Sequence, residues 1–448
     1  MSARDDKRIP LAHEIEDTTL GSGERVASTA EQRRADPRAS TGRGGFAVAG
    51  PITAGIAATT VVALPGMLVG GLSILIQHEL GFNEAELGAA IAATFVSGAV
   101  MAVPAGRIAE QFGPRRTAWV GLACGLVALL GIGFLATSWA SLVAFLIVAG
   151  AGITLVQLGV NVLVARAVPP NRQGLAYGAK QAAVPMASLL AGFAVPAVGL
   201  TLGWRVAFIL GAVLVPIAAW RMPDTPPTRR VSSTPGKGLV PPNALVLLAI
   251  GVALASAGGN SAPAFTVLSA VDRGLSPSDA GLLLALGSLA GIVVRVAAGW
   301  LGDRLGRNAL LIVVGLVGTG AVGFTGLALS DQPLLISLFT VLAFGGGWGW
   351  GGLVLLALTR TSPTAPGRAM GVVQVGPMAG AVLGPLMFGW LAATVSYSAA
   401  WSAMAFLALA GVVAILVSRR RLLEWQRAPG GPGPKLDRDV ISRDEASY

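Results

Sequence analysis

Apolar stretches of about twenty residues recur along most of this chain, and each is long enough to cross a hydrocarbon core of about 30 Å as an α-helix. Only 12% of the 448 residues are charged, and the mean hydropathy is +0.70. The chain is therefore predicted to be an all-α integral membrane protein. We place twelve transmembrane helices at about 52–77, 86–106, 118–136, 141–165, 174–198, 203–222, 243–270, 279–300, 309–329, 334–358, 369–393 and 400–418.

The connections between these spans alternate in charge. Basic residues gather in alternate connections that share a side with both termini, whereas the opposite connections are mainly acidic, with Arg205 and Arg273 as exceptions. By the positive-inside rule, both termini are predicted to be cytoplasmic, in a multi-pass protein of the cell membrane. The net charge of +10 is thus explained by topology, and no nucleic-acid partner is expected.

Two polar tails and one polar linker divide the chain. Residues 1–48 mix charge with Ser, Thr, Gly and Pro and lack an apolar core, which predicts a disordered cytoplasmic tail and not a signal peptide. We expect one six-helix bundle over 49–222, a Pro-rich cytoplasmic linker over 223–242, a second six-helix bundle over 243–421, and a cytoplasmic tail over 422–448.

An internal repeat relates the two bundles. "GRIAEQFGPRR" begins at Gly106, after the second span, and "GWLGDRLGRN" begins at Gly299, after the eighth, 193 residues later. Gln181 and Gln374 are also 193 residues apart. Because each half contains an even number of spans, both copies point the same way through the membrane.

These residues resemble the major facilitator superfamily of secondary transporters. The resemblance rests on the pattern Gly-x-x-x-(Asp/Glu)-x-x-Gly followed by basic residues, found once in each half, and covers residues 50–420. It implies a membrane transporter that works by alternating access, and not an enzyme. The first copy departs from the usual pattern, with Glu110 where Asp is commoner and Gln111 where a basic residue is usual.

The doubled motif predicts a gate at the cytoplasmic side. Gly106 and Gly299 are small enough for close helix packing, and Gly113 and Gly306 permit a tight turn. A carboxylate between them can pair with an arginine of a neighbouring helix, a contact that breaks when the halves rock. Alternatively, the arginines only set topology. The gating candidates are Gly106, Glu110, Gly113, Arg115, Arg166, Gly299, Asp303, Arg304, Gly306, Arg307 and Arg360.

Polar residues are unevenly spread among the spans. Helices 3, 6, 9 and 12 carry almost none and are predicted to be outer, lipid-facing supports. Thr154, Gln157 and Asn161 form one stripe on helix 4, and Tyr177, Lys180, Gln181 and Ser188 share a broad face of helix 5. The substrate-binding candidates are Lys180, Gln181, Tyr177, Gln157, Asn161, Asn260, Arg295 and Gln374.

Each candidate also has a structural interpretation. A lone Gln or Asn in a membrane helix can simply join two helices. Lys180 and Arg295 lie close enough to helix ends to snorkel to the surface. The tryptophans of "GGGWGWGG" (345–352) form an aromatic wall in one interpretation, and the glycines serve only close packing in the other.

The sign of the embedded charge favours anions. No Asp or Glu lies well inside any span, whereas Lys180 and Arg295 do, so a cavity between the halves would have a positive field. Arg-x-x-x-Gly in helix 8 also resembles the anion-binding arginine of carboxylate carriers within the superfamily. The leading hypothesis is a carrier for a small organic anion, such as a monocarboxylate, moved with a proton or in exchange for another anion.

Three other functions are weighed against it. Efflux of neutral or hydrophobic compounds is the main alternative, with Lys180 structural. A non-transporting sensor would need modules in the tails, which the tails do not suggest. An enzyme is not expected, since there is no His-Glu-x-x-His, no Gly-x-Ser-x-Gly and no pair of embedded carboxylates. We expect no cofactor, no metal site and a monomer in the lipid bilayer.

Overall fold

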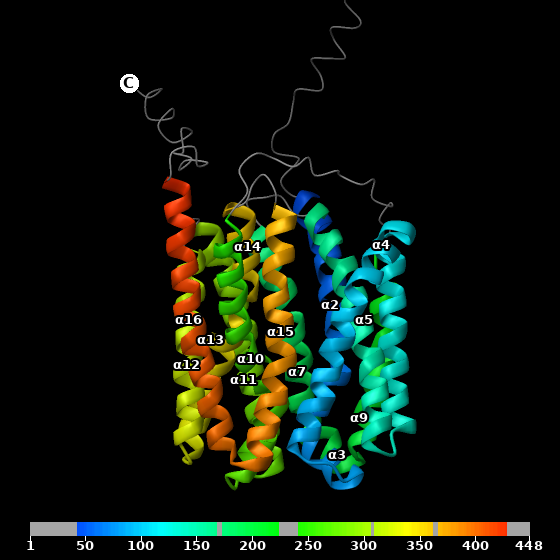
Figure 1. Ribbon diagram of the computed structural model, residues 1–448. Helices are drawn as coiled ribbons and strands as arrows, with labels where there is room; N and C mark the ends of the chain where they lie inside the picture. The colour runs from blue at the N-terminus through cyan, green and yellow to red at the C-terminus, as the bar shows by residue number, and fades with distance from the viewer. Residues whose placement is uncertain (1–42, 168–172, 224–240, 306–308, 362–365, 428–448) are drawn as a thin grey trace, which may run out of the picture. The chain divides into compact units, whose positions relative to one another are not determined.

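The computed structural model describes residues 43–167, 173–223, 241–305, 309–361 and 366–427. Residues Ala49–Tyr448 form one compact unit, separate from Met1–Val48. The described ranges are helices joined by short connections and contain no strand, which confirms the all-α prediction (Figure 1). Helices suit a lipid environment because each satisfies its own backbone hydrogen bonds.

The first half runs through nine elements in chain order. They are α2 (Arg43–Gly71), α3 (Ser73–Leu80), α4 (Glu84–Leu135), α5 (Trp139–Ala167), α6 (Gln173–Gln181), α7 (Ala183–Ala194), the π-helix η2 (Val195–Gly199), α8 (Leu200–Leu202) and α9 (Trp204–Trp220). The helix α2 begins at Arg43, inside the stretch predicted as a tail.

The second half consists of α10 (Pro242–Asp272), α11 (Pro277–Leu305), α12 (Ala309–Leu329), α13 (Pro333–Gly349), α14 (Gly351–Thr361), α15 (Pro366–Thr394) and α16 (Tyr397–Arg427). The last helix continues to Arg427, beyond the predicted end of the bundle at 421.

The described helices supply twelve membrane spans, because α4 contains two of them and the shorter α9 adds one. Ten described segments are long and apolar enough to cross a membrane, and one of them, α4, contains two of the predicted spans. Gly113 divides α4, with a left-handed φ of 81° that a side chain would strain. The 17-residue α9 supplies the remaining span.

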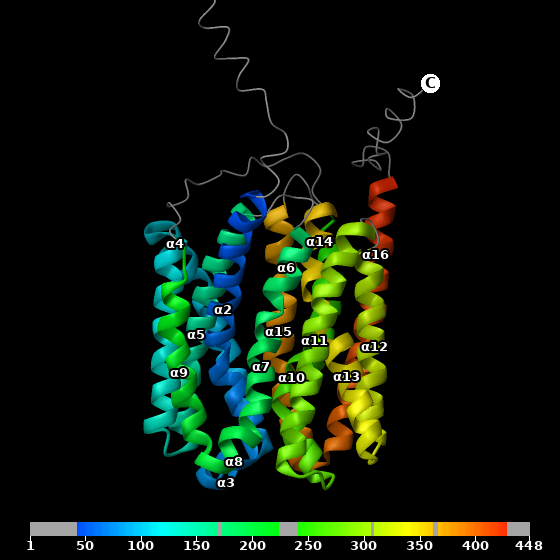
Figure 2. The ribbon, with the colours of Figure 1, turned by 180° about the vertical axis from the view of Figure 1, so that it is seen from behind.

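The outer helices lie at the two ends of the compact unit. Figures 1 and 2 place α12 and α16 at one end and the α4–α9 pair at the other. Their outward faces carry exposed apolar side chains, among them Val213 on α9, Val322 on α12 and Phe406 on α16. This is the predicted division into outer supports and inner helices.

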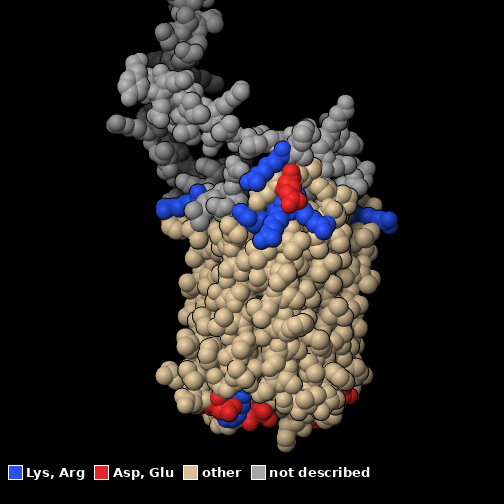
Figure 3. Space-filling model, turned by 60° about the vertical axis from the view of Figure 1, so that its left-hand side comes forward, with Lys and Arg blue, Asp and Glu red and all other residues tan. Residues whose placement is uncertain are grey.

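Charged side chains gather at the two ends of the helices (Figure 3). We call one end the basic rim, which includes Arg107, Arg116, Arg221, Arg304 and Arg419 to Arg421. The other end is the acidic rim, which includes Glu79, Glu84, Asp272, Asp279 and Asp331.

Candidate functional site

Lys180 lies near the end of α6 and is 4% exposed. Its Nζ donates one hydrogen bond to Gln157 Oε1 of α5 and another, of 3.2 Å, to the neighbouring Gln181 Oε1. An ammonium group has three N–H donors, so one has no partner among the described residues. Three of the predicted site residues therefore meet, and the lysine points to amides and not to the rim.

Arg295 lies on α11, is 6% exposed and also stays inside the protein. Its guanidinium carbon is 4.5 Å from the ring centroid of Trp348, a cation–π contact. Its Nε and Nη1 are buried and donate no hydrogen bond within the described part of the chain. The side chain leans back toward Gly291, one turn nearer the helix start, which is opposite to the snorkelling direction.

The two cations lie on helices that touch. A Cβ atom on Gly178 of α6 would lie only 2.6 Å from the carbonyl oxygen of Arg295 and 3.3 Å from Gly299 Cα on α11. Gln181 is also near the second half, since a Cβ on Gly351 of α14 would be 3.5 Å from its Nε2. Lys180 and Arg295 are thus brought to one interface between the halves.

The surroundings of "GGGWGWGG" show close packing of its glycines and a contact between Trp348 and Arg295, whereas the aromatic wall against a substrate stays a prediction. Trp348 carries Arg295 on its ring and packs edge-on against Phe344 at 6.0 Å. The glycines serve packing: a Cβ on Gly346 would meet the backbone of α12, 2.5 Å from Gly320 N. Trp350 bonds its own helix segment, donating from Nε1 to Gly347 O at 2.9 Å.

No described carboxylate forms an ion pair or hydrogen bond with either cation. Burying an unpaired charge is costly, and each unsatisfied buried donor adds about 1–3 kcal/mol. An arrangement of two cations, two amides and spare donors is chemically suited to bind an anion.

The remaining candidates whose side chains the structure describes form no hydrogen bond with this cluster. Asn161 and Gln374 are exposed on α5 and α15, and among the described residues neither bonds to Lys180 or Arg295. Asn260 bonds its own helix, donating to the carbonyl and hydroxyl oxygens of Ser256 at 2.9 Å. The side chain of Tyr177 lies outside the described residues.

Two of the predicted polar stripes are not continuous wet faces. Thr154 donates to Gly98 O of α4 at 2.9 Å, so it joins helices while Gln157 faces Lys180. Ser188 is fully buried and accepts a 2.8 Å hydrogen bond from Ser288 of α11. The face of helix 5 beyond Lys180 is therefore a packed contact with the other half.

The gating candidates are only partly described. The side chains of Arg166, Asp303 and Arg360 lie outside the described residues, and so do Gly306 and Arg307 as a whole. Glu110 is exposed, Arg115 lies over the ring of Trp119 at 4.5 Å, and Arg304 lies over that of Trp300 at 3.8 Å. The predicted pairing of carboxylate and arginine stays a prediction.

Gly106 corrects one expectation. The motif predicts close packing there, yet a Cβ on Gly106 would meet nothing within 4 Å, whereas Gly299 contacts α6 at Gly178. The same motif position therefore borders open space in the first half and a tight helix contact in the second.

The halves also meet toward the acidic rim. A Cβ on Gly70 would lie 2.6 Å from Pro263 O, and one on Gly192 would lie 2.6 Å from Ala285 N. Tyr397 of α16 donates to Glu84 Oε1 of α4 at 3.2 Å. These contacts join the halves on that side.

A polar cluster at the acidic rim joins Glu79, Trp204 and Arg205, a contact that the sequence analysis does not predict. Glu79 accepts hydrogen bonds from Arg205 and, at 2.6 Å, from Trp204 Nε1, and Arg205 also donates to Ala136 O at 2.8 Å. These bonds, that of Arg205 first, hold the pKa of Glu79 below its usual value. The signal was available, because Arg205 is a basic exception among acidic connections.

Comparison with known proteins settles the family. The model of the Major Facilitator Superfamily matches residues 54–254 and 246–443. The chain belongs to this superfamily. It is thus a membrane transporter and not an enzyme.

Individual relatives within the superfamily differ in what they are named for. The chain is 28% identical to "Monocarboxylate transporter 11" of Homo sapiens over 377 residues, covering 74% of this chain and 76% of the relative. It is 27% identical to a "Chloramphenicol resistance protein" of Streptomyces lividans over 347 residues, covering 71% and 83%.

A solved structure shares the fold. A crystal structure of a mutant of the nucleoside transporter NupG superposes with a TM-score of 0.64 at 13% identity, covering 82% of this chain and 99% of that one. At this identity the likeness concerns the fold alone.

Proposed function

We propose that this transporter of the superfamily moves a small organic anion, a carboxylate, by alternating access. The observation that carries the proposal is the Arg295 guanidinium, buried on Trp348 with Nε and Nη1 unsatisfied, at the contact between α11 and the Lys180 helix. A carboxylate would accept hydrogen bonds from these donors and balance the charge.

Lys180 and Arg295 are proposed to bind the anion in different ways. Lys180 has a spare N–H, and the amide groups of Gln157 and Gln181, whose oxygens accept from it, keep their own N–H donors for a bound anion. The donors of Arg295 are sealed in this conformation, so the anion reaches them when the halves move. Asn260, Tyr177, Asn161 and Gln374 are proposed to line the path.

The proposed direction of access follows from charge. By the positive-inside rule the basic rim is cytoplasmic, with both termini on that side of the cell membrane. The contacts toward the acidic rim would then keep the outer side closed in this conformation. Glu110 with Arg166, and Asp303 with Arg360, are proposed as the pairs that close the cytoplasmic side.

The named relatives support two candidates. "Monocarboxylate transporter 11" agrees with a carboxylate, whereas the "Chloramphenicol resistance protein" supports efflux of neutral compounds as the second candidate. The two cations, which pair with no described carboxylate, favour the first, because a neutral compound would not balance their charge. The proposed coupling is a proton or a counter-moving anion.

Uptake by the purified protein in proteoliposomes tests the proposal. Labelled acetate, lactate and succinate, with chloramphenicol as a neutral probe, would be measured with and without an imposed pH gradient. We expect uptake of a carboxylate that is lost in Arg295→Gln and retained in Arg420→Gln, a cation at the basic rim on α16. Transport of chloramphenicol alone, unaffected by Arg295→Gln, would favour the neutral-compound function.

A further inference from the structure

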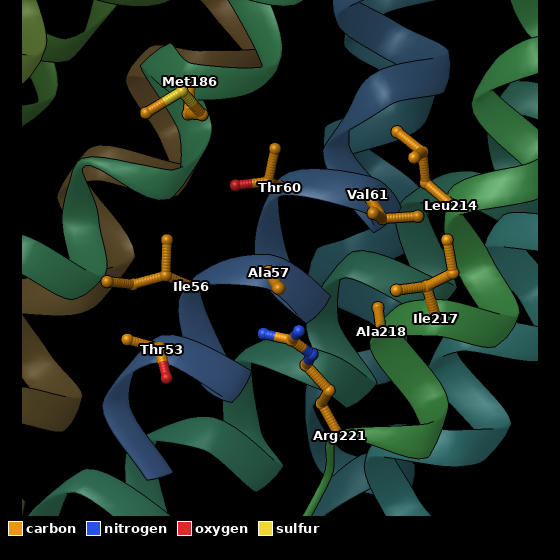
Figure 4. Close-up of a pocket in the computed structure, with 10 residues that line it drawn as sticks. All are labelled: Thr53, Ile56, Ala57, Thr60, Val61, Met186, Leu214, Ile217, Ala218 and Arg221. Carbon is orange, nitrogen blue, oxygen red and sulfur yellow. The ribbon is translucent and has the colours of Figure 1, made fainter. Parts of the chain in front are cut away.

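An open crevice lies in the first half, and its lining residues are separate from the Lys180–Arg295 cluster. It measures about 470 Å³, within the range of about 300–1,000 Å³ of small-molecule sites. Thr53, Ile56 and Ala57 of α2, Met186 of α7, and Ile217 of α9 line it, with Arg221 at its end (Figure 4). None of the residues that line it belongs to the anion site.

The cavity is apolar and adjoins the lipid-facing surface. Its α9 wall includes Leu214 and Ile217, which are 38% and 51% exposed on an outer helix. Thr60 is engaged elsewhere, donating to Ala183 O of α7 at 3.1 Å. The space thus suits a hydrocarbon chain from the bilayer more than a polar solute.

Arg221 adds a charge at the rim end of this cavity. It follows directly after α9, in the basic rim, and its guanidinium points into the cavity toward Ala57 (Figure 4). It is exposed, and no described carboxylate pairs with it. A cation at the membrane surface beside an apolar crevice matches the two parts of an anionic lipid.

The second half lacks such a crevice between the described parts of α10 and α16. There the two helices close on each other: a Cβ on Gly251 would lie 2.6 Å from Ile415 Cγ1, and one on Gly411 would lie 2.8 Å from Gly251 O. Ser418 closes the rim end by donating to Ala244 O at 2.7 Å. The described contacts between α10 and α16 therefore leave no counterpart of the crevice between those two helices.

We propose that this crevice binds an anionic membrane lipid, with the phosphate at Arg221 and one acyl chain between α2, α7 and α9. The binding energy comes from apolar burial along the chain and from one phosphate–guanidinium contact.

Lipid binding to the delipidated full-length protein tests this site directly. Native mass spectrometry would compare dioleoyl phosphatidylglycerol, dioleoyl phosphatidylcholine, which has the same chains, and glycerol 3-phosphate, which has none. We expect phosphatidylglycerol to bind at least about fivefold more tightly than phosphatidylcholine, the effect of about one basic residue at the surface. Glycerol 3-phosphate should not bind measurably.

Variants locate the site. Arg221→Gln should reduce phosphatidylglycerol binding to the phosphatidylcholine level, whereas the matched Arg420→Gln on α16 should not change it. Ala57→Phe should weaken both lipids by filling the crevice. If Ala57→Phe does not fold, Ile217→Trp narrows the mouth from an exposed position instead.

Three results would overturn the proposal: equal binding of the two lipids, wild-type phosphatidylglycerol binding in Arg221→Gln, or binding of glycerol 3-phosphate as tight as that of the lipid. None of these results depends on whether the protein transports carboxylates.

Discussion

Two of the contacts between the halves, α6 with α11 and α4 with α15, are equivalent in the repeat but differ in packing. Shifting by 193 residues relates Gly178 to Gly371 and Gly299 to Gly106. Gly178 and Gly299 touch across α6 and α11, whereas a Cβ on Gly371 or Gly106, on α15 and α4, would meet nothing within 4 Å. The basic-rim side is closed at one interface and loosely packed at the other.

The embedded charged residues are distributed with the same asymmetry. Lys180 corresponds to the buried Val373, and Arg295 corresponds to Ala102. Both embedded cations therefore lie at the closed interface and neither lies at its counterpart. The repeat thus supplies a common helical framework, while single residue differences at one interface create the candidate anion site.

Among the variants that test this asymmetry, Arg295→Gln should have the largest effect on uptake. We expect carboxylate uptake to fall about 100-fold, since losing one partner of a buried charged contact costs about 2–5 kcal/mol. The measurement is initial uptake rate in proteoliposomes at matched protein incorporation. Arg295→Lys, which keeps the charge but not the planar stack on Trp348, should recover only part of the rate. A wild-type uptake rate in Arg295→Gln would show that the transported anion does not bind at this interface.

Lys180→Gln should reduce uptake about tenfold, because one charge-assisted hydrogen bond is lost while the amide contacts stay possible. Its thermal stability in detergent should stay equal or rise, since the variant no longer buries a charge that pairs with no described carboxylate. A purely structural Lys180 predicts the reverse, with normal uptake and a lower unfolding temperature.

Gly178→Ala and Gly371→Ala form a matched pair on the two interfaces. The first should destabilise the protein by about 1–3 kcal/mol, because its Cβ would press on the Arg295 backbone. The second should change stability by less than about 0.5 kcal/mol. Thermal unfolding in detergent measures both, and equal effects would mean that the interfaces are packed alike.

Glu79→Gln, at the acidic rim of the first half, should have the smallest effect, below about 1 kcal/mol, because the pair with Arg205 is partly exposed. The folded pKa of Glu79 is lowered, so its contribution is present above the ordinary carboxyl pKa and is lost as the pH falls through the lowered value. The stability difference between wild type and variant should therefore be seen at pH 7 and vanish in acid. A difference that persists unchanged to low pH would show that the charge of Glu79 is not its source.

The framework could be predicted from the sequence because its causes are local. Span positions follow from runs of apolar residues, the charge division follows from the connections, and Gly113 marks a turn by its place in a motif. The substrate candidates were predicted less fully. Lys180, Gln157 and Gln181 meet as one group, but Asn260 bonds its own helix. Ser188, predicted on the same face as Lys180, lies in a packed contact with Ser288.

Contacts between helices that are distant in the sequence decide how the embedded cations are oriented. They also decide which of the two equivalent interfaces, α6–α11 or α4–α15, is closely packed. Arg295 has an open path to the surface by sequence spacing, and it is the contact with Trp348 of α13 that holds it inside. The membrane class, the two related halves and the excess of embedded positive charge are all fixed by residue order alone. The closed α6–α11 contact is not fixed by residue order alone. Close packing depends on the shapes of two surfaces at once, and each helix supplies only one of them.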